Sequence, residues 1–108
     1  MTLEELQVKV VAFRDDRDWR KFHTPKNLAQ ALIEEVGELN SLYLWDRQPA
    51  LIKVAHEIAD IQIYLLSLVD VLGIDLGEAV LRKLVKNNLK YPIERAKGND
   101  QKYSDHND

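Results

Sequence analysis

The sequence predicts an all-α fold, a four-helix-type bundle subunit that assembles as a homo-oligomer. Apolar residues recur at three- and four-residue spacing through most of the chain, and no segment alternates with the two-residue period of a strand. Capping residues stand where three of these segments begin, and Pro or Gly stands just after three of them end. At 108 residues the chain is one domain with a modest core, which self-association would extend.

Start and stop signals divide the chain into four expected helices. Thr2 with Glu5 three residues later forms a capping box, and Thr24 is an N-cap followed by proline at the first helical position. Asp75 and Glu78 form a second capping box. The expected helices cover about residues 3–18, 25–45, 50–72 and 75–90, and the predicted domain covers residues 1–92. Residues 93–108 are polar, so we expect a mobile tail.

The third expected helix predicts self-association. Its apolar residues, which occupy almost every side, are Ile58, Ile61, Ile63, Leu65, Leu66, Leu68, Val69, Val71 and Leu72. A helix that is apolar all round must be buried all round, and three other short helices can hardly surround it. We therefore expect a dimer or a dimer of dimers with two-fold symmetry.

Composition limits which classes of partner and which cellular compartment are compatible with the chain. The formal net charge of −3 argues against a nucleic-acid duplex as partner, because no basic excess is present to displace counterions. The absence of cysteine excludes disulfides and thiolate metal sites and is compatible with a reducing cytoplasm. The N-terminal residues lack the pattern of a signal peptide. The most apolar stretch, residues 58–72, is too short and too interrupted by polar residues for a membrane span. We expect a cytoplasmic protein.

Two sets of acids at helical spacing are the most informative feature of the chain. Glu34, Glu35 and Glu38 lie in the second expected helix, and Glu57 and Asp60 lie in the third. Residues three or four apart share one helix face, so each set projects carboxylates from one patch. Like charges at that spacing repel, and half-buried carboxylates are costly to desolvate. Hard divalent cations, which prefer oxygen ligands, are the most economical explanation.

The ordinary alternative is a solvated acidic face with lysine partners. The first set lacks such partners, since no Lys or Arg lies between Lys26 and Arg47. On neighbouring antiparallel helices the two sets could face each other around one or two Mg²⁺ or Mn²⁺ ions. The Glu-x-x-His pairs of a di-iron bundle are absent, and His56-Glu57 fails the zinc-protease pattern because position 60 is Asp.

Two further groups of residues suit a nucleotide. Lys83, Asn87 and Tyr91 recur every four residues, so they form one stripe of a helix that suits phosphate and sugar recognition; a solvated polar face is the alternative. Trp19 and Trp45 lie at helix ends or connectors. Their indoles suit base stacking, with core or interface packing as the alternative.

The combined motifs resemble a known family. E-E-x-x-E (Glu34, Glu35, Glu38) followed by E-x-x-D (Glu57, Asp60) is similar to the MazG-like all-α nucleoside triphosphate pyrophosphohydrolases. The segments that resemble the dCTP pyrophosphatase branch of that family are Arg17-Asp18-Trp19, Phe22-His23, Pro25, Asn27-Leu28, Lys83, Asn87 and Tyr91-Pro92. The resemblance covers roughly residues 1–92.

The resemblance implies a homodimer or homotetramer that cleaves a nucleoside triphosphate to the monophosphate and pyrophosphate with Mg²⁺, or with Mn²⁺ in its place. It implies dCTP or a modified dCTP as the preferred substrate, in a nucleotide-pool house-cleaning role. It also implies the metal ligands Glu35, Glu38, Glu57 and Asp60, with Glu34, Glu35 and Glu38 as the catalytic set. Trp19, Trp45, Lys83, Asn87 and Tyr91 are then the substrate-binding residues.

Two non-catalytic readings remain open at this point. One is an acidic helical adaptor whose carboxylates bind a basic partner, which would bind without metal and turn over no nucleotide. The other is a regulatory module that binds nucleotides without hydrolysis. The complete set of four acids argues against the second reading, because a degraded enzyme would usually have lost one ligand.

Overall fold

The computed structural model describes residues 1–98, and every regular element in that range is helical. The elements are α1 (Leu3–Asp16), a 3₁₀ turn η1 (Arg20–Phe22), α2 (Pro25–Leu44), α3 (Leu51–Leu72), α4 (Leu76–Lys90) and α5 (Ile93–Ala96). The all-α prediction is therefore confirmed. None of these helices is long and apolar enough to cross a membrane.

Side-chain caps start α1 and α2 where the sequence predicted. The Thr2 hydroxyl accepts from the backbone N–H of Glu5 at 3.1 Å, and the Thr24 hydroxyl accepts from that of Asn27 at 3.2 Å. Each bond satisfies one of the backbone donors that a helix start leaves unpaired. α1 ends two residues earlier than expected, because Asp18 adopts a left-handed conformation with φ of 54°. A left-handed residue cannot continue the helix.

α3 ends at Gly73 in the way the sequence predicted. Gly73 has φ of 70°, and its N–H donates to the carbonyls of Val69 and Asp70. A left-handed residue after the last helical turn is the usual helix stop, and glycine adopts it without steric cost.

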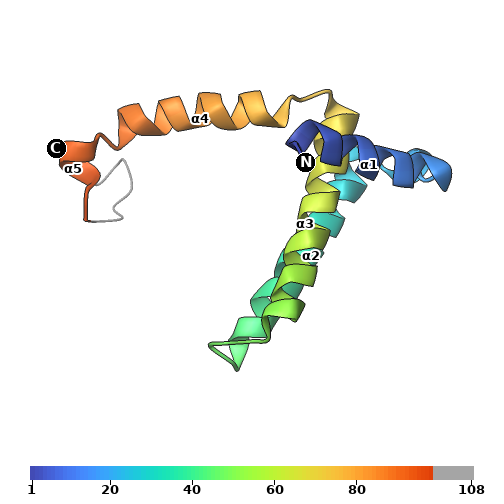
Figure 1. The fold of residues 1–108 in the computed structure, drawn as a ribbon, viewed down its shortest axis with the longest axis horizontal. Coiled ribbons are helices and arrows are strands. Elements are labelled where there is room, and N and C mark those ends of the chain that lie inside the picture. The colour runs from blue at the N-terminus through green and yellow to red at the C-terminus, as the bar shows by residue number, and fades with distance from the viewer. Residues whose placement is uncertain (99–108) are drawn as a thin grey trace. The chain divides into compact units, whose positions relative to one another are not determined.

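The first of two compact units, Met1–Asp75, contains α1, α2 and α3. α2 and α3 lie side by side and run antiparallel, and α1 packs across α3 near its C-terminal end (Figure 1). Leu28 of α2 and Leu66 of α3 are fully buried. This pairing places the acids of α2 opposite those of α3.

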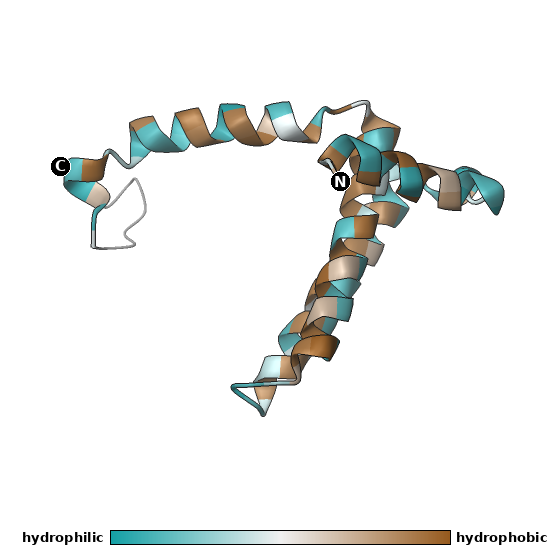
Figure 2. Cartoon of the chain, in the orientation of Figure 1, coloured by the Kyte–Doolittle hydropathy of each residue, from teal (hydrophilic) through white to brown (hydrophobic). Residues whose placement is uncertain are grey.

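The apolar surface of α3 is only partly buried within this chain. Leu66 and Val69 are buried, whereas Ile58, Ile63 and Leu72 are about half exposed. Figure 2 shows apolar residues along most of α3. The expectation that a second copy covers this surface stays a prediction.

The second unit begins at Leu76 and is described by itself. It contains α4, which lies within the expected bounds, and the short helix α5, which the sequence did not predict. Pro92 is the N-cap of α5, in extended backbone with φ of −60°. The predicted mobile tail otherwise falls mainly on residues 99–108, which lie outside the described residues.

Candidate active site

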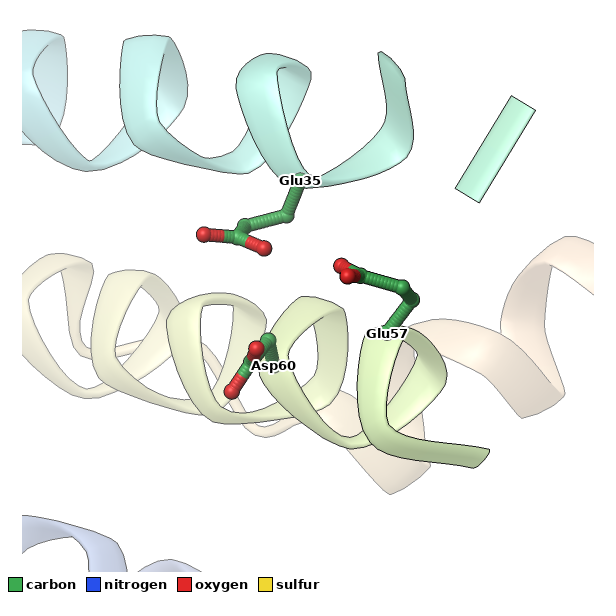
Figure 3. A group of neighbouring side chains, drawn as sticks. All are labelled: Glu35, Glu57 and Asp60. Carbon is green, nitrogen blue, oxygen red and sulfur yellow. The ribbon is translucent and has the colours of Figure 1, made fainter. Parts of the chain in front are cut away.

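Three carboxylates from the two antiparallel helices form a cluster. Glu35 projects from α2 toward α3, and Glu57 and Asp60 project from successive turns of α3 (Figure 3). One oxygen of each side chain lies within 4.8 Å of an oxygen of each of the others. Among the described residues this is the group of acids and histidines with the spacing to hold a metal ion.

Two oxygens of this cluster are buried without a hydrogen-bond partner. They are Oε2 of Glu35 and Oε2 of Glu57. Buried carboxylate oxygens are normally satisfied, and leaving one unpaired is costly. A divalent cation between the helices would satisfy both oxygens and remove their repulsion, so the donor set fits a hard metal ion such as Mg²⁺ or Mn²⁺.

The pKa values of the cluster are those of carboxyl groups that have other carboxylates, and no cation, as neighbours. Burial, followed by the charges of Glu38 and Asp60, raises the pKa of Glu35 to about 7. Burial and the charge of Glu38 also raise the pKa of Glu57. No nearby cation offsets these effects for either side chain. Without a bound cation, Glu35 therefore keeps its proton to a higher pH than an ordinary glutamate does.

Glu38 and Glu34 differ in their relation to the cluster. Glu38 is exposed but close enough to Glu35 and Glu57 to raise the pKa of both. Glu34 is exposed and lies outside the three-carboxylate group. The structure thus gathers four of the five predicted acids around one place, and the individual roles stay predictions.

A cavity of about 370 Å³ adjoins the cluster within the first unit. Asp60 lines it at the cluster, and Phe13, Trp19 and Tyr64 contribute aromatic side chains. The rings of Phe13 and Trp19 meet edge-on, with centroids 5.8 Å apart. A pocket of this volume with aromatic walls and few polar groups is typical of small-molecule sites.

The structure brings one of the five predicted substrate-binding residues to this pocket, namely Trp19. Trp45 is the C-cap of α2, is 94% exposed and does not line the pocket. Lys83, Asn87 and Tyr91 lie on α4 in the second unit, which is described by itself. Their role stays a prediction.

A buried arginine at this pocket escaped the sequence analysis. Arg14 is 3% exposed; its Nε donates to Asp15 at 2.9 Å and its Nη1 donates to Asp70 at 2.8 Å. Burial by itself would lower the pKa of Arg14, but the hydrogen bonds to Asp15 and Asp70 have the larger combined effect, so the pKa is raised. Ser67 and Asp70 are the signal that the sequence offered, because they are polar positions on an otherwise apolar helix.

The fold and the site define an all-helical protein with a carboxylate cluster beside an aromatic pocket. Known proteins are similar to this chain in sequence and in fold. The sequence model of the MazG-like family matches residues 26–105. The dCTP pyrophosphatase 1 of Bos taurus is 38% identical to this chain, over 96% of this chain and 68% of the bovine protein. The Homo sapiens protein of that name is 36% identical, over 96% and 67%.

A solved structure extends the similarity to three dimensions. A pyrophosphatase from Archaeoglobus fulgidus superposes with a TM-score of 0.78 and 45% sequence identity, covering 83% of this chain and 92% of that one. The chain belongs to the MazG-like family. This membership confirms the predicted enzyme class, a nucleoside triphosphate pyrophosphohydrolase.

Proposed function

We propose that this protein cleaves dCTP, or a modified dCTP, to the monophosphate and pyrophosphate in a reaction that depends on Mg²⁺ or Mn²⁺. The observation that carries the proposal is the cluster of Glu35, Glu57 and Asp60, with two buried oxygens that lack partners, at the rim of an aromatic pocket. The names of the bovine and human relatives support dCTP as the substrate.

The acidic cluster alone would repel a triphosphate, so a cation must lie between them. We assign the metal to Glu35, Glu57 and Asp60, with Glu38 beside them. The bound metal would neutralise the triphosphate charge and polarise the phosphoryl group that reacts. Each ligand carboxylate must be ionised to bind it.

The remaining chemistry falls to side chains of this chain. Water cleaves the anhydride bond between the α- and β-phosphoryl groups, pyrophosphate leaves, and the proton of the water passes to a carboxylate. We assign that proton to Glu34, which adjoins Glu35 in sequence and is not needed as a ligand. The base stacks on Trp19 and Phe13. We assign the phosphates and sugar to the α4 stripe that begins at Lys83.

Self-association is part of the proposal. Half-exposed apolar residues on α3 and the 94% exposed Trp45 are surfaces that a soluble monomer seldom leaves uncovered. We infer that a second copy of the chain covers them and that Trp45 is buried at that interface. The assembly is a dimer or a dimer of dimers.

Product analysis tests the reaction. The protein is incubated with each common NTP and dNTP and Mg²⁺, and the products are separated by ion exchange. We expect monophosphate and pyrophosphate, fastest from a cytosine nucleotide. Activity should disappear in Glu57→Gln and persist in Glu4→Gln, an exposed acid outside the cluster. Diphosphate and orthophosphate would refute the bond assignment, and metal-independent binding without turnover would favour an acidic adaptor.

A further inference from the structure

We propose that Arg14 is the residue that selects the nucleobase, by donating hydrogen bonds to adjacent acceptors on the edge of a cytosine-type ring. The inference rests on the proposed function, because it places the base of the substrate in the pocket beside the carboxylate cluster. Asp15 and Asp70 are positioning residues that fix the guanidinium.

The geometry of α3 sets the direction of the substrate. Asp60, Tyr64 and Ser67 all line the pocket and are spaced four and three residues apart, so they share one face of the helix. A rise of about 1.5 Å per residue separates Asp60 from Ser67 by about 10 Å along the helix axis. With the triphosphate at the cluster next to Asp60, the base points along this face toward Ser67 and Arg14.

Arg14 is oriented for this task by its two aspartates. Nε is bonded to Asp15 and Nη1 to Asp70, whereas no described residue accepts a hydrogen bond from Nη2. The side chain is 97% covered yet lines the pocket, so little of it is open to solvent outside the cavity. A guanidinium that is held by two carboxylates loses little entropy when it donates once more.

The pocket contains no competing cation among the residues that line it. Burial, together with the charge of Arg14, lowers the pKa of His23, which keeps that imidazole neutral at pH 7. The Ser67 hydroxyl donates to the carbonyl of Ile63 at 2.9 Å, so it offers the pocket only acceptor capacity. Arg14 therefore supplies the charged donor and Ser67 supplies an acceptor.

This set of groups distinguishes pyrimidines. Cytosine presents two adjacent acceptors, the ring nitrogen N3 and the carbonyl O2, next to an amino donor. Thymine and uracil carry a hydrogen on N3, which would meet the donor-only guanidinium of Arg14. A buried site that is built to pair with an acceptor rejects a ring that presents a donor there, because both groups are left unpaired.

The test is the ratio of kcat/KM for dCTP to that for dTTP, measured with Arg14→Gln and Arg20→Gln. Arg20 is the matched control, because it approaches the same Asp70 carboxylate at 3.6 Å but is exposed and does not line the pocket. We expect Arg14→Gln to lower the ratio about 10- to 100-fold, the usual effect of one charge-assisted hydrogen bond. Arg20→Gln should leave it unchanged.

A purely structural role for Arg14 predicts a different pattern. Loss of its tie to α3 would weaken dCTP and dTTP turnover equally, and an unchanged ratio in an active, folded Arg14→Gln variant would overturn the inference. If that variant does not fold, Arg14→Lys serves instead. It keeps the charge but has a single nitrogen in place of the planar fork whose separate nitrogens reach Asp15, Asp70 and the base, so it should lose selectivity too.

Binding of non-hydrolysable dCTP and dTTP analogues, followed by tryptophan fluorescence, separates this inference from the proposed function. If wild type hydrolyses nucleotides and Arg14→Gln has the same ratio of kcat/KM for dCTP to that for dTTP, the role of Arg14 is refuted and the reaction stands. Wild type that prefers the dCTP analogue in an Arg14-dependent way but hydrolyses nothing would refute the reaction and leave the base selection standing.

Discussion

Glu35→Gln should make the metal-free protein more stable while it abolishes stabilisation by metal. Glu35 lies within 4.8 Å of both Glu57 and Asp60, and its Oε2 is buried without a partner. Coulomb repulsion at that separation is roughly 3 kcal/mol at an effective dielectric of 20 and roughly 1 kcal/mol with full solvent screening. An amide of the same shape removes the charge and can donate to a neighbouring carboxylate.

The expected gain in the free energy of unfolding is about 1–2 kcal/mol in EDTA at about pH 8, where Glu35 is ionised. For a domain of this size that gain corresponds to a rise in Tm of about 5–10 °C. Saturating Mg²⁺ should then raise the Tm of wild type, because the ion binds only the folded state, and should leave that of Glu35→Gln unchanged.

Differential scanning calorimetry in EDTA and in Mg²⁺ measures both effects, with Glu34→Gln as the matched control. Glu34 is the neighbouring acid but is exposed and outside the cluster, so its loss should change neither Tm nor the response to Mg²⁺. A lower Tm for Glu35→Gln than for Glu34→Gln in EDTA would refute the reasoning, because it would show that the Glu35 carboxylate has a favourable partner.

Two further predictions follow from the same structure. Burial raises the pKa of Glu35 from an ordinary value of 4.5 to about 7, so in EDTA the folded state holds a proton that the unfolded state releases. Urea denaturation should show that the stability of wild type relative to Glu35→Gln falls as pH rises from about 4.5 to about 7; a flat difference would contradict this. Light scattering after size exclusion should find that wild type is a dimer or tetramer. Trp45→Ser should weaken this assembly, and the control Lys26→Ser should not. A monomeric wild type would contradict the proposed interface.

The helices were predictable wherever a local signal decides the backbone. The Thr2 and Thr24 caps and the Gly73 stop each act through residues only a few positions away. Asp18 was placed in a helix because nothing in its neighbourhood forbids one; its left-handed conformation belongs to the turn that leads into η1. α5 was missed because a single helical turn after a proline carries almost no periodic signal.

The acidic part of the site was predictable because it, too, depends on the spacing of residues within single helices. Glu35 and Glu38 share a face by their spacing, as do Glu57 and Asp60, and the pairing of α2 with α3 brings Glu35 to Glu57. The family resemblance named Glu35 rather than Glu34 as a metal ligand, but helical spacing alone does not separate the two, because each is spaced to share a face with Glu38. Only the structure shows that Glu34 stays exposed outside the group.

The Arg14–Asp70 pair could not be predicted, since 56 positions separate its members and their contact depends on how α1 crosses α3. The pair matters for the site because it holds the guanidinium of Arg14, whose charge Asp15 and Asp70 balance, at the pocket that Asp60 also lines. Asp60 and the acidic cluster lie at one end of the α3 face, and Arg14 lies beyond Ser67 at the other. In the proposed arrangement the metal-bound triphosphate occupies the first end, and the acceptor edge of the base meets the guanidinium of Arg14 at the second. In that arrangement the same face of α3 orients the substrate and discriminates between bases, so a change at Arg14 should alter selectivity without altering metal binding.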